Sequence, residues 1–237
     1  MDLPIPKIPH DMKNRLDSSR LTSIWGDFGV GKTTLAIQTV LAHFKEKKGK
    51  ILYFYTKPNF PMNKIQQYLG SDKRDLMEKF TEMFTLITIS DFRSLRKALM
   101  NLELVITRSK NQKNRISLIV IDSITDLYKL EIIREKKEKN ASINYLLNLI
   151  LGTLFYLSIT YDLEIVIVNE LVHRKKGEEI SEVQSGGKVT NFWTSLNIKV
   201  ERTSILNNRK VIFYDQNYEK LAEFDLFLTK KGFSSEK

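Results

Sequence analysis

A glycine-rich loop followed by a lysine and two threonines is the first feature of this sequence that can do chemistry. Residues 24–38 read IWGDFGVGKTTLAIQ, and residues 26–33 fit the pattern G-x-x-x-x-G-K-[ST]. Glycines let such a loop wrap so that successive backbone N–H groups point at a β-phosphate, while Lys32 adds a positive charge and the Thr33 hydroxyl ligates Mg²⁺. We therefore predict a cradle for a nucleoside triphosphate, made of Gly26, Asp27, Phe28, Gly29, Val30, Gly31, Lys32, Thr33 and Thr34.

An acid lies at the end of an apolar run further along the chain. Residues 116–122 read ISLIVID, which is the pattern of a strand buried on both faces. In P-loop proteins an aspartate at this position holds Mg²⁺, usually through water. A strand-terminal aspartate is common by itself, but Asp122 and the loop together predict nucleotide and Mg²⁺ binding from two independent features.

The composition fits a single domain. With 237 residues and 42% hydrophobic content, the chain is long enough for one α/β domain with a full core and short for two. We take residues 1–237 as one ATP-binding domain, with residues 1–20 as an N-terminal extension. The absence of cysteine excludes disulfides, thiol catalysis and cysteine metal sites. The N-terminus lacks the basic-then-apolar pattern of a signal peptide, so we expect a cytoplasmic protein.

The charge balance is basic. There are 38 Lys+Arg against 28 Asp+Glu, a formal net charge of +10. Such an excess favours a polyanionic partner, with nucleic acid before an anionic membrane. A lysine-rich composition with solvated charges explains it equally well, so composition alone does not decide between the two.

Strand-like and helix-like segments alternate along the chain. We predict strands at 51–56, 86–90, 116–122 and 163–169, and helices at 32–45, at 61–83 with a break, and from residue 90 or 91 to about residue 110. The part after residue 194 alternates polar and apolar residues, which predicts closing antiparallel strands. This order predicts an α/β fold, with a mostly parallel sheet flanked by helices and joined by right-handed crossovers.

One apolar segment approaches the length of a membrane span. Residues 143–160 read INYLLNLILGTLFYLSIT and contain no charged residue. The segment does contain Asn144, Asn148, Ser158 and Thr160, and it lies between two strand-like runs. A helix buried against the sheet therefore explains it better than a transmembrane helix, and we expect no membrane partner.

The series of motifs resembles the ATPase core of the RecA/RadA recombinases, and most closely the short archaeal RadB-type paralogs that lack the N-terminal DNA-binding domain. The phosphate loop, the stretch LIVIDSITDLYKLE (118–131) and the stretch SGGK (185–188) carry the resemblance, which covers roughly residues 20–233. It implies a P-loop, RecA-like fold with C-terminal antiparallel strands, ATP and Mg²⁺ as cofactors, and a role in homologous recombination and DNA repair.

In that family two loops contact the backbone of single-stranded DNA. Here they correspond to EIIREKKEKN (131–140) and HRKKGEEISEVQSGGK (173–188). Cations in such loops give salt-dependent affinity without sequence preference. Glutamates in both stretches keep the net charge small, and two solvated mobile loops are the alternative. The resemblance assigns DNA contact to Arg134, Lys136, Lys137, Lys139, Arg174, Lys175, Lys176 and Lys188.

The sequence departs from the family at the residue that activates the attacking water. Family members end their second core strand in Asp-Thr-Glu, and this Glu polarises the water. The stretch LYFYTKPNFPMNKI (52–65) aligns without a gap and places Lys57 at the Glu position. An ammonium group that is protonated at pH 7 cannot accept a proton. Two family arginines near the adenine correspond to Pro61 and Lys64, so contacts there also differ.

A second departure lies at the end of strand 163–169. The sequence has Asn169-Glu170 where the family has Asn-Gln, whose Gln reports the γ-phosphate to the DNA loop. A carboxylate there repels phosphate oxygens unless a cation intervenes. The family's strand order puts the strand of Asp122 between those of Lys57 and Glu170. We hypothesise that Lys57 pairs with Glu170, with Asp122 or with the γ-phosphate. In the competing hypothesis Glu170 is the general base. The other residue assigned to catalysis is Lys32 of the phosphate loop.

Three functions follow from this combination. The first is an ATP-binding accessory factor that binds single-stranded DNA, a RadA-type recombinase or another paralog, with weak or absent hydrolysis. The second is a DNA-stimulated ATPase with a relocated base. The third is a KaiC-like regulatory or scaffolding module without DNA binding. We expect no filaments, because about twenty residues precede the loop strand and the family's Asp-Ser-Pro cap corresponds to residues 215–217, Asp-Gln-Asn.

Overall fold

A mostly parallel sheet forms the centre of the molecule. The computed structural model describes residues 20–70, 74–109, 115–176 and 179–235. The strands within these ranges are β1 (Leu21–Gly26), β2 (Lys50–Tyr55), β3 (Phe84–Thr88), β4 (Ile116–Asp122), β5 (Glu164–Lys176), β6 (Glu179–Gln184), β7 (Leu196–Arg202), β8 (Asn208–Asp215), β9 (Lys220–Thr229) and β10 (Gly232–Ser234).

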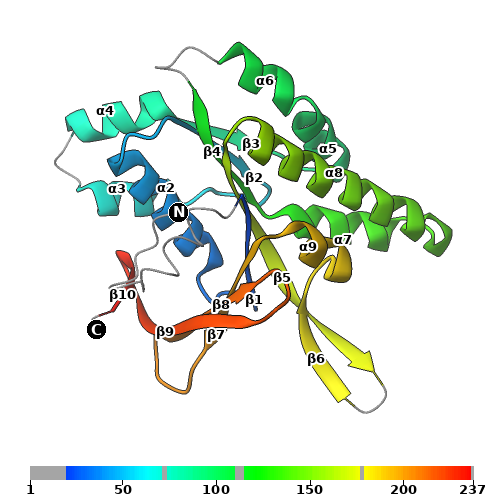
Figure 1. The fold of residues 1–237 in the computed structure, drawn as a ribbon. Helices are drawn as coiled ribbons and strands as arrows, with labels where there is room; N and C mark the ends of the chain where they lie inside the picture. Colours follow the sequence, from blue (N-terminus) through cyan, green and yellow to red (C-terminus); the bar gives the residue numbers. More distant parts are fainter. Residues whose placement is uncertain (1–19, 71–73, 110–114, 177–178, 236–237) are drawn as a thin grey trace.

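The strand order places the carboxyl ends of the central strands at one edge. It runs β10-β9-β8-β7-β1-β5-β4-β2-β3, with β6 paired to β5 outside this path. The strands from β7 to β3 pair in parallel, whereas β8, β9 and β10 add antiparallel strands (Figure 1). The predicted α/β fold with C-terminal antiparallel strands is confirmed. The predicted position of the Asp122 strand between β2 and β5 is confirmed as well.

Helices cover both faces of the sheet (Figure 1). They are α2 (Lys32–Lys45), α3 (Met62–Leu69), α4 (Arg74–Met83), α5 (Phe92–Met100), α6 (Leu102–Arg108), α7 (Ile124–Arg134), the 3₁₀ turn η1 (Lys137–Lys139), α8 (Asn140–Thr160) and α9 (Gly187–Trp193). Helices α2, α3 and α4 enclose one apolar core with side chains such as Leu35, Ile65 and Phe80. Helices α5 to α8 enclose the other, with side chains such as Leu95 and Leu154.

The long apolar helix α8 presents two different faces. A window within residues 137–160 has a mean hydropathy of 1.5, and 39% of that window is buried. The predicted packing against the sheet is confirmed for one face, where Leu147, Ile150, Leu151, Leu154 and Leu157 are fully buried. The other face exposes Tyr145, Leu149, Tyr156 and Ile159, which sequence reasoning did not expect.

Three predicted segments differ from the structure. The single helix from residue 91 is two helices, α5 and α6, separated at Asn101, whose side chain and backbone N–H both donate to the Lys97 carbonyl. The predicted loop at 173–188 is largely an antiparallel hairpin of β5 and β6, where Val172 pairs with Val183 and His173 with Glu182. The charged connector at 131–140 is shorter than predicted, since α7 continues to residue 134 and α8 begins at residue 140.

Candidate nucleotide-binding site

The phosphate loop joins β1 to α2 through backbone conformations that require glycine. Gly26 has φ +152°, and a Cβ there would lie 2.2 Å from the Val200 carbonyl oxygen. Gly31 has φ +111°, and its Cβ would lie 2.8 Å from the Phe233 ring. The loop therefore passes closely between β7 and β10, and α2 begins directly after it with its N-terminal N–H groups facing the loop.

Two arginines, one on β7 and one on β8, hold the loop in place. Arg202 Nη2 donates to the Phe28 carbonyl at 2.9 Å, and Arg209 Nε donates to the Val30 carbonyl at 3.2 Å. The Phe28 side chain itself is 78% exposed. Both bonds are made to carbonyl groups of the loop, so neither of them uses a backbone N–H group that a phosphate would need. No local sequence signal marks Arg202 or Arg209 for this role.

Lys32 is buried, and its ammonium group donates hydrogen bonds to three acceptors within the protein. Its Nζ donates to the carbonyls of Gly26 at 3.0 Å and Asp27 at 2.7 Å, and to Glu170 Oε2 at 2.8 Å. Burial lowers the pKa of Lys32, although the hydrogen bond that Lys32 donates to Glu170 acts in the opposite direction. Glu170 is therefore paired with the same ammonium group that a bound phosphate would need.

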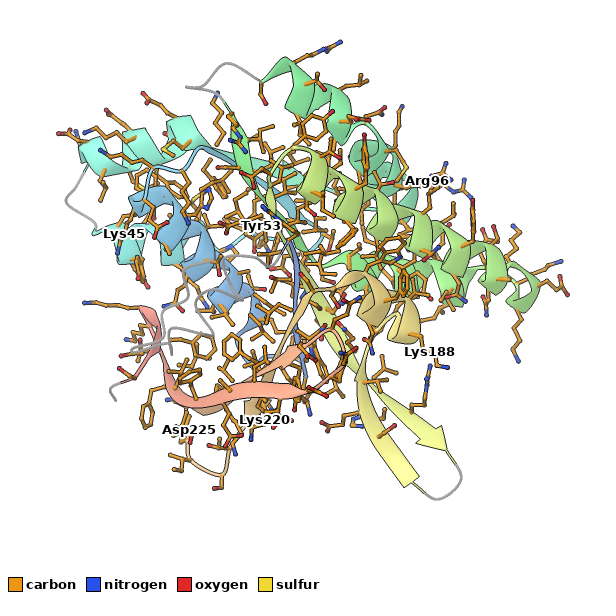
Figure 2. The ribbon with its side chains drawn as sticks, in the orientation of Figure 1. Lys45, Tyr53, Arg96, Lys188, Lys220 and Asp225 are labelled. Atoms are coloured by element: carbon orange, nitrogen blue, oxygen red, sulfur yellow. The ribbon has the colours of Figure 1, made fainter. Side chains whose placement is uncertain are left out.

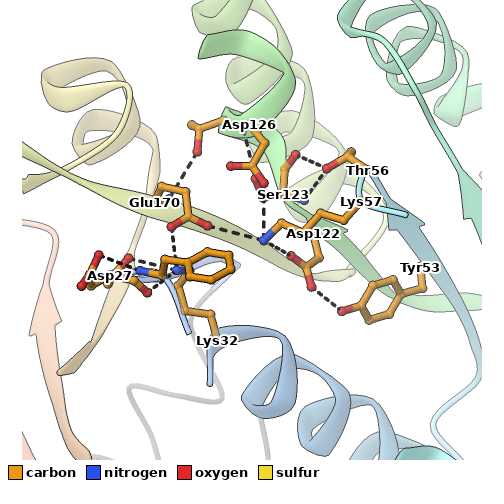
Figure 3. Close-up of polar contacts among 12 residues, drawn as sticks. Asp27, Lys32, Tyr53, Thr56, Lys57, Asp122, Ser123, Asp126 and Glu170 are labelled. Carbon is orange, nitrogen blue, oxygen red and sulfur yellow. Dashed lines mark hydrogen bonds and ion pairs between the residues drawn. The ribbon is translucent and has the colours of Figure 1, made fainter. Parts of the chain in front are cut away.

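Lys57 follows β2 and lies among three carboxylates, which come from the end of β4, the first turn of α7 and the point where β5 leaves the parallel sheet (Figure 3). Its Nζ is 3.4 Å from Glu170 Oε1, 3.4 Å from Asp126 Oδ2 and 4.0 Å from Asp122 Oδ1. Burial acts to lower the pKa of Lys57, but the three carboxylates outweigh it and raise the pKa. The hypothesis that Lys57 pairs with Glu170 agrees with this geometry. Sequence reasoning missed Asp126, four residues after Asp122 on the first turn of α7.

Asp122 is fully buried, as its place at the end of β4 predicts. Its Oδ2 accepts a hydrogen bond from Tyr53 OH at 3.1 Å, whereas Oδ1 has no hydrogen-bond partner among the described residues. Burial raises the pKa of Asp122, with Lys57 and the Thr33 hydroxyl acting against it. An unpaired buried carboxylate oxygen beside a threonine hydroxyl fits Mg²⁺ or one of its water ligands.

Thr33 and Asp122 are the two predicted ligands of a metal ion, and the structure places both at the phosphate loop. Within the described part of the chain, no three histidine or acidic side chains form a ready-made metal site. Mg²⁺ keeps several waters and takes further oxygens from substrate phosphates in nucleotide sites. The pair therefore fits a magnesium ion that arrives with the nucleotide, rather than one held by the protein alone.

These parts enclose a pocket of about 280 Å³. Lys64, which the alignment places at a family arginine position, enters this pocket and donates from Nζ to Thr34 Oγ1 at 2.6 Å. Burial lowers the pKa of Lys64. The structure thus brings together the predicted loop, Lys57 and Glu170. The lining residues are Phe28, Gly29, Gly31, Lys32, Thr33, Thr34, Lys57, Lys64, Glu170 and Leu228.

A buried polar network connects the site to the base of the hairpin. Gln184 Oε1 accepts from Ser23 Oγ at 2.6 Å and from Asn169 Nδ2 at 3.0 Å. Gln184 Nε2 donates to Asn197 Oδ1 and to Tyr218 OH. Since Asn169 precedes Glu170, the network fixes the tip of β5 against β1 and the hairpin. Sequence reasoning did not find Gln184, which is polar but only 1% exposed.

The predicted DNA-contacting residues lie in two places. Arg134, Lys136, Lys137 and Lys139 are exposed around the turn between α7 and α8, where Lys139 also pairs with Glu135 at 2.6 Å. Arg174 is exposed on the hairpin, and its guanidinium lies next to Gly187, the residue before exposed Lys188. The side chains of Lys175 and Lys176 lie outside the described residues. Exposure of these cations is compatible with backbone contact.

Comparison with known proteins identifies relatives of this chain. The Rad51 family model matches residues 10–222. A DNA repair and recombination protein RadB from Methanocaldococcus jannaschii is 28% identical over 182 residues, or 77% of this chain and 78% of that protein. The RadB of Methanococcus maripaludis is 25% identical over 212 residues, covering 90% and 89%. A crystal structure of the RadB recombinase matches with a TM-score of 0.69 and 20% identity, covering 92% and 90%, which bears on the fold alone.

Proposed function

Because the chain belongs to the Rad51 family, and its relatives are of the RadB type, we propose that it is an ATP-binding accessory protein of DNA recombination and repair, with weak or absent ATP hydrolysis. The observation that carries the proposal is Lys57. Its ammonium group lies among three carboxylates at the tip of β2, beside a phosphate loop that is complete.

The loop supports nucleotide binding. Its glycines, the N-terminus of α2 and the Lys32 ammonium together favour a triphosphate. Thr33 and Asp122 are the residues that would hold Mg²⁺, which would neutralise charge on the phosphate oxygens when bound. Lys64, next to Thr34, adds a further cation at the pocket.

Hydrolysis needs a group that orients water and accepts its proton. The carboxylates around Lys57 raise its pKa, so this residue is an ammonium group at neutral pH and cannot act as a base. Glu170 is the other candidate, and its carboxylate does face the pocket. Both of its oxygens, however, are bound by ammonium groups, Oε2 by Lys32 and Oε1 by Lys57. This arrangement favours a holder of ATP over an ATPase.

The proposed partners rest on the family of the chain and on its exposed positive charges. We propose that the protein binds single-stranded DNA through the exposed cations of the α7–α8 turn and the hairpin, together with a RadA-type recombinase or another paralog, in the cytoplasm. The proposal takes residues 1–237 as one RecA-like domain; the N-terminal extension, except for residue 20, lies outside the described residues. A nucleotide-dependent scaffold without DNA binding is the second candidate, favoured by the small net charge of both DNA segments.

One paired measurement tests the proposal. Binding of Mg·ATP by calorimetry and release of phosphate are recorded on the full chain, each with and without oligothymidylate. We expect ATP binding, salt-sensitive DNA binding and turnover far below about 1 s⁻¹. Turnover of about 1 s⁻¹ or faster would establish an ATPase instead. ATP binding without any DNA binding at low salt would favour the scaffold.

A further inference from the structure

A second cavity lies at the opposite end of α2 from the phosphate loop. Its volume is about 970 Å³, against about 280 Å³ for the nucleotide pocket. Helix α2 has 14 residues, so at about 1.5 Å per residue the two sites are about 20 Å apart. We call this cavity the basic pocket. It is lined by Phe44, Lys45, Lys47, Lys48, Gly49, Lys50, Leu69, Leu76, Lys79, Glu82 and Met83.

The basic pocket carries a concentrated positive charge. Its lining contains five lysines and one glutamate. Lys48 is partly neutralised by Glu46 at 2.6 Å and Glu164 at 3.6 Å. By contrast, no carboxylate among the described residues pairs with Lys47, Lys50 or Lys79, each of which belongs to this lining. Three ammonium groups therefore face one cavity without a negative partner from the described chain, which favours an anionic ligand.

The turn that presents two of these lysines is held in one conformation. Gly49 has φ +143°, and a Cβ there would lie 2.6 Å from both the Arg115 carbonyl oxygen and Ser117 Oγ. The Lys50 N–H donates to the Arg115 carbonyl at 2.8 Å. This backbone is therefore fixed against the start of β4, so a ligand does not have to order the turn before binding to it.

The floor of the basic pocket is apolar. Phe44 and Leu69 are 6% and 5% exposed, and Leu76 and Met83 are partly buried against the same core. A ligand that fills the pocket thus needs apolar groups as well as negative charge. The aromatic ring in the lining, Phe44, is therefore nearly covered, and the ring of Tyr68, next to Leu69 in the sequence, is covered by Lys45 Nζ at 4.8 Å from its centroid. Within the described lining there is accordingly no exposed ring on which a base could stack, and a phosphate backbone brings no apolar group of its own.

We propose that the basic pocket binds an acidic segment of a partner protein. Apolar side chains of that segment pack on Leu76 and Met83, and its Asp and Glu side chains pair with Lys47, Lys50 and Lys79. Figure 2 shows Lys45 at this corner of the molecule, on the side of α3 and α4. Because the pocket lies at the far end of α2 from the nucleotide, the two ligands bind independently, and the inference goes beyond the proposed ATP function.

The test uses the full chain and a fluorescein-labelled short peptide of Asp and Glu residues around a Leu-Phe pair, with anisotropy as the readout. The variant Lys47→Glu/Lys50→Glu/Lys79→Glu is compared with Lys97→Glu/Lys230→Glu/Lys231→Glu, which makes the same charge change on exposed lysines outside the pocket. We expect the pocket variant to weaken peptide binding by about tenfold or more, and the control variant by less than about twofold. Equal losses in both variants, or no binding by the wild type, overturn the proposal.

Two further arms identify the ligand class. Leu76→Ser changes no charge and should weaken the Leu-Phe peptide by about fivefold, while a peptide with Ser-Ser in place of Leu-Phe binds both proteins equally. Fluorescein-labelled oligothymidylate should bind the pocket variant as it binds the control variant. If oligothymidylate is lost together with the peptide, the occupant is nucleic acid and the proposal fails. Saturating ATP should leave peptide binding unchanged, so a failure of ATP binding would not affect this result.

Discussion

The phosphate loop after β1 and the segments around Lys57 and Glu170 line one pocket. The loop keeps the residues of the family pattern, whereas the other two segments have replaced theirs. The loop keeps every group that the motif requires. At Gly26 and Gly31 any other residue would place a Cβ atom too close to its neighbours. The neighbouring tips instead carry Lys57 and Glu170, where the resemblance predicts a glutamate and a glutamine. Binding and hydrolysis therefore depend on different strand tips, and one can change while the other is kept.

The two regions meet at a single carboxylate. Glu170 binds Lys32 of the loop at 2.8 Å and Lys57 of the β2 tip at 3.4 Å. The charge changes compensate one another locally, because Lys57 is surrounded by Asp122, Asp126 and Glu170. A nucleotide that binds at the loop would therefore have to displace Glu170 from Lys32 before its phosphates could reach the ammonium group.

The largest expected effect comes from the loop itself. Lys32→Ala should weaken ATP binding by about 100-fold, or about 2.7 kcal/mol, because a buried ammonium group that bonds phosphate is lost. Calorimetry measures the affinity, and Lys97→Ala, an exposed lysine on α5, is the control with unchanged binding. Binding retained within threefold in Lys32→Ala would mean that Glu170 keeps this lysine from the phosphates.

A second prediction restores the expected residues at the tips. Lys57→Glu alone puts a fourth carboxylate beside Asp122, Asp126 and Glu170, so it is combined with Glu170→Gln. The double variant should release phosphate about 100-fold faster than the wild type, since a general base contributes about 10²–10⁴-fold. The single variant Glu170→Gln should leave the basal rate unchanged.

The opposite pattern identifies a relocated base. If the wild type releases phosphate measurably and Glu170→Gln alone abolishes this release, then Glu170 is the base. Lys57 would then not have inactivated the site. If the double variant releases phosphate no faster than the wild type, the account in which Lys57 silences the site is wrong.

A smaller effect is expected on affinity. Glu170→Gln removes the carboxylate that competes with phosphate for Lys32 and should tighten ATP binding by about tenfold, or about 1.4 kcal/mol. The gain should be smaller for ADP if Glu170 occupies the place of the γ-phosphate. Glu219→Gln, an exposed glutamate, provides the control. Weaker binding in Glu170→Gln would show that the carboxylate assists the nucleotide rather than competing with it.

The smallest effect concerns stability. Burial raises the pKa of Asp122, so its ionised form costs more in the folded than in the unfolded chain. That cost is complete above the raised pKa and disappears as the pH falls below the ordinary carboxyl value. Asp122→Asn keeps an acceptor for Tyr53 and should raise the free energy of unfolding at pH 7 by about 1 kcal/mol in denaturant titrations. The difference should shrink on acidification, and a less stable variant at pH 7 would contradict this account.

Local pattern was enough to predict the loop, the buried strand ending in Asp122 and the alternation of strands and helices. Glycine spacing and hydrophobic period act within a few residues of chain, so the sequence expresses them directly. The hairpin of β5 and β6 was predicted as a loop because its sequence is rich in charged residues. The pairing of Val172 with Val183 is therefore not evident from the sequence pattern. The break at Asn101 was missed because no glycine or proline marks it in residues 91–110.

By itself, then, the sequence predicted a phosphate cradle, and its resemblance to a family assigned Lys57 to the position of the base. Only the tertiary structure decided what Lys57 and Lys32 touch, since β5-β4-β2 adjacency brings Glu170, Asp126 and Lys57 together from distant parts of the chain. It also decided that Arg202 and Arg209 hold the loop. Contacts of this kind depend on strand order and on distances between side chains. Local sequence preferences determine neither the strand order nor these distances. The interaction energies of buried charges, however, depend on the strand order and on the distances.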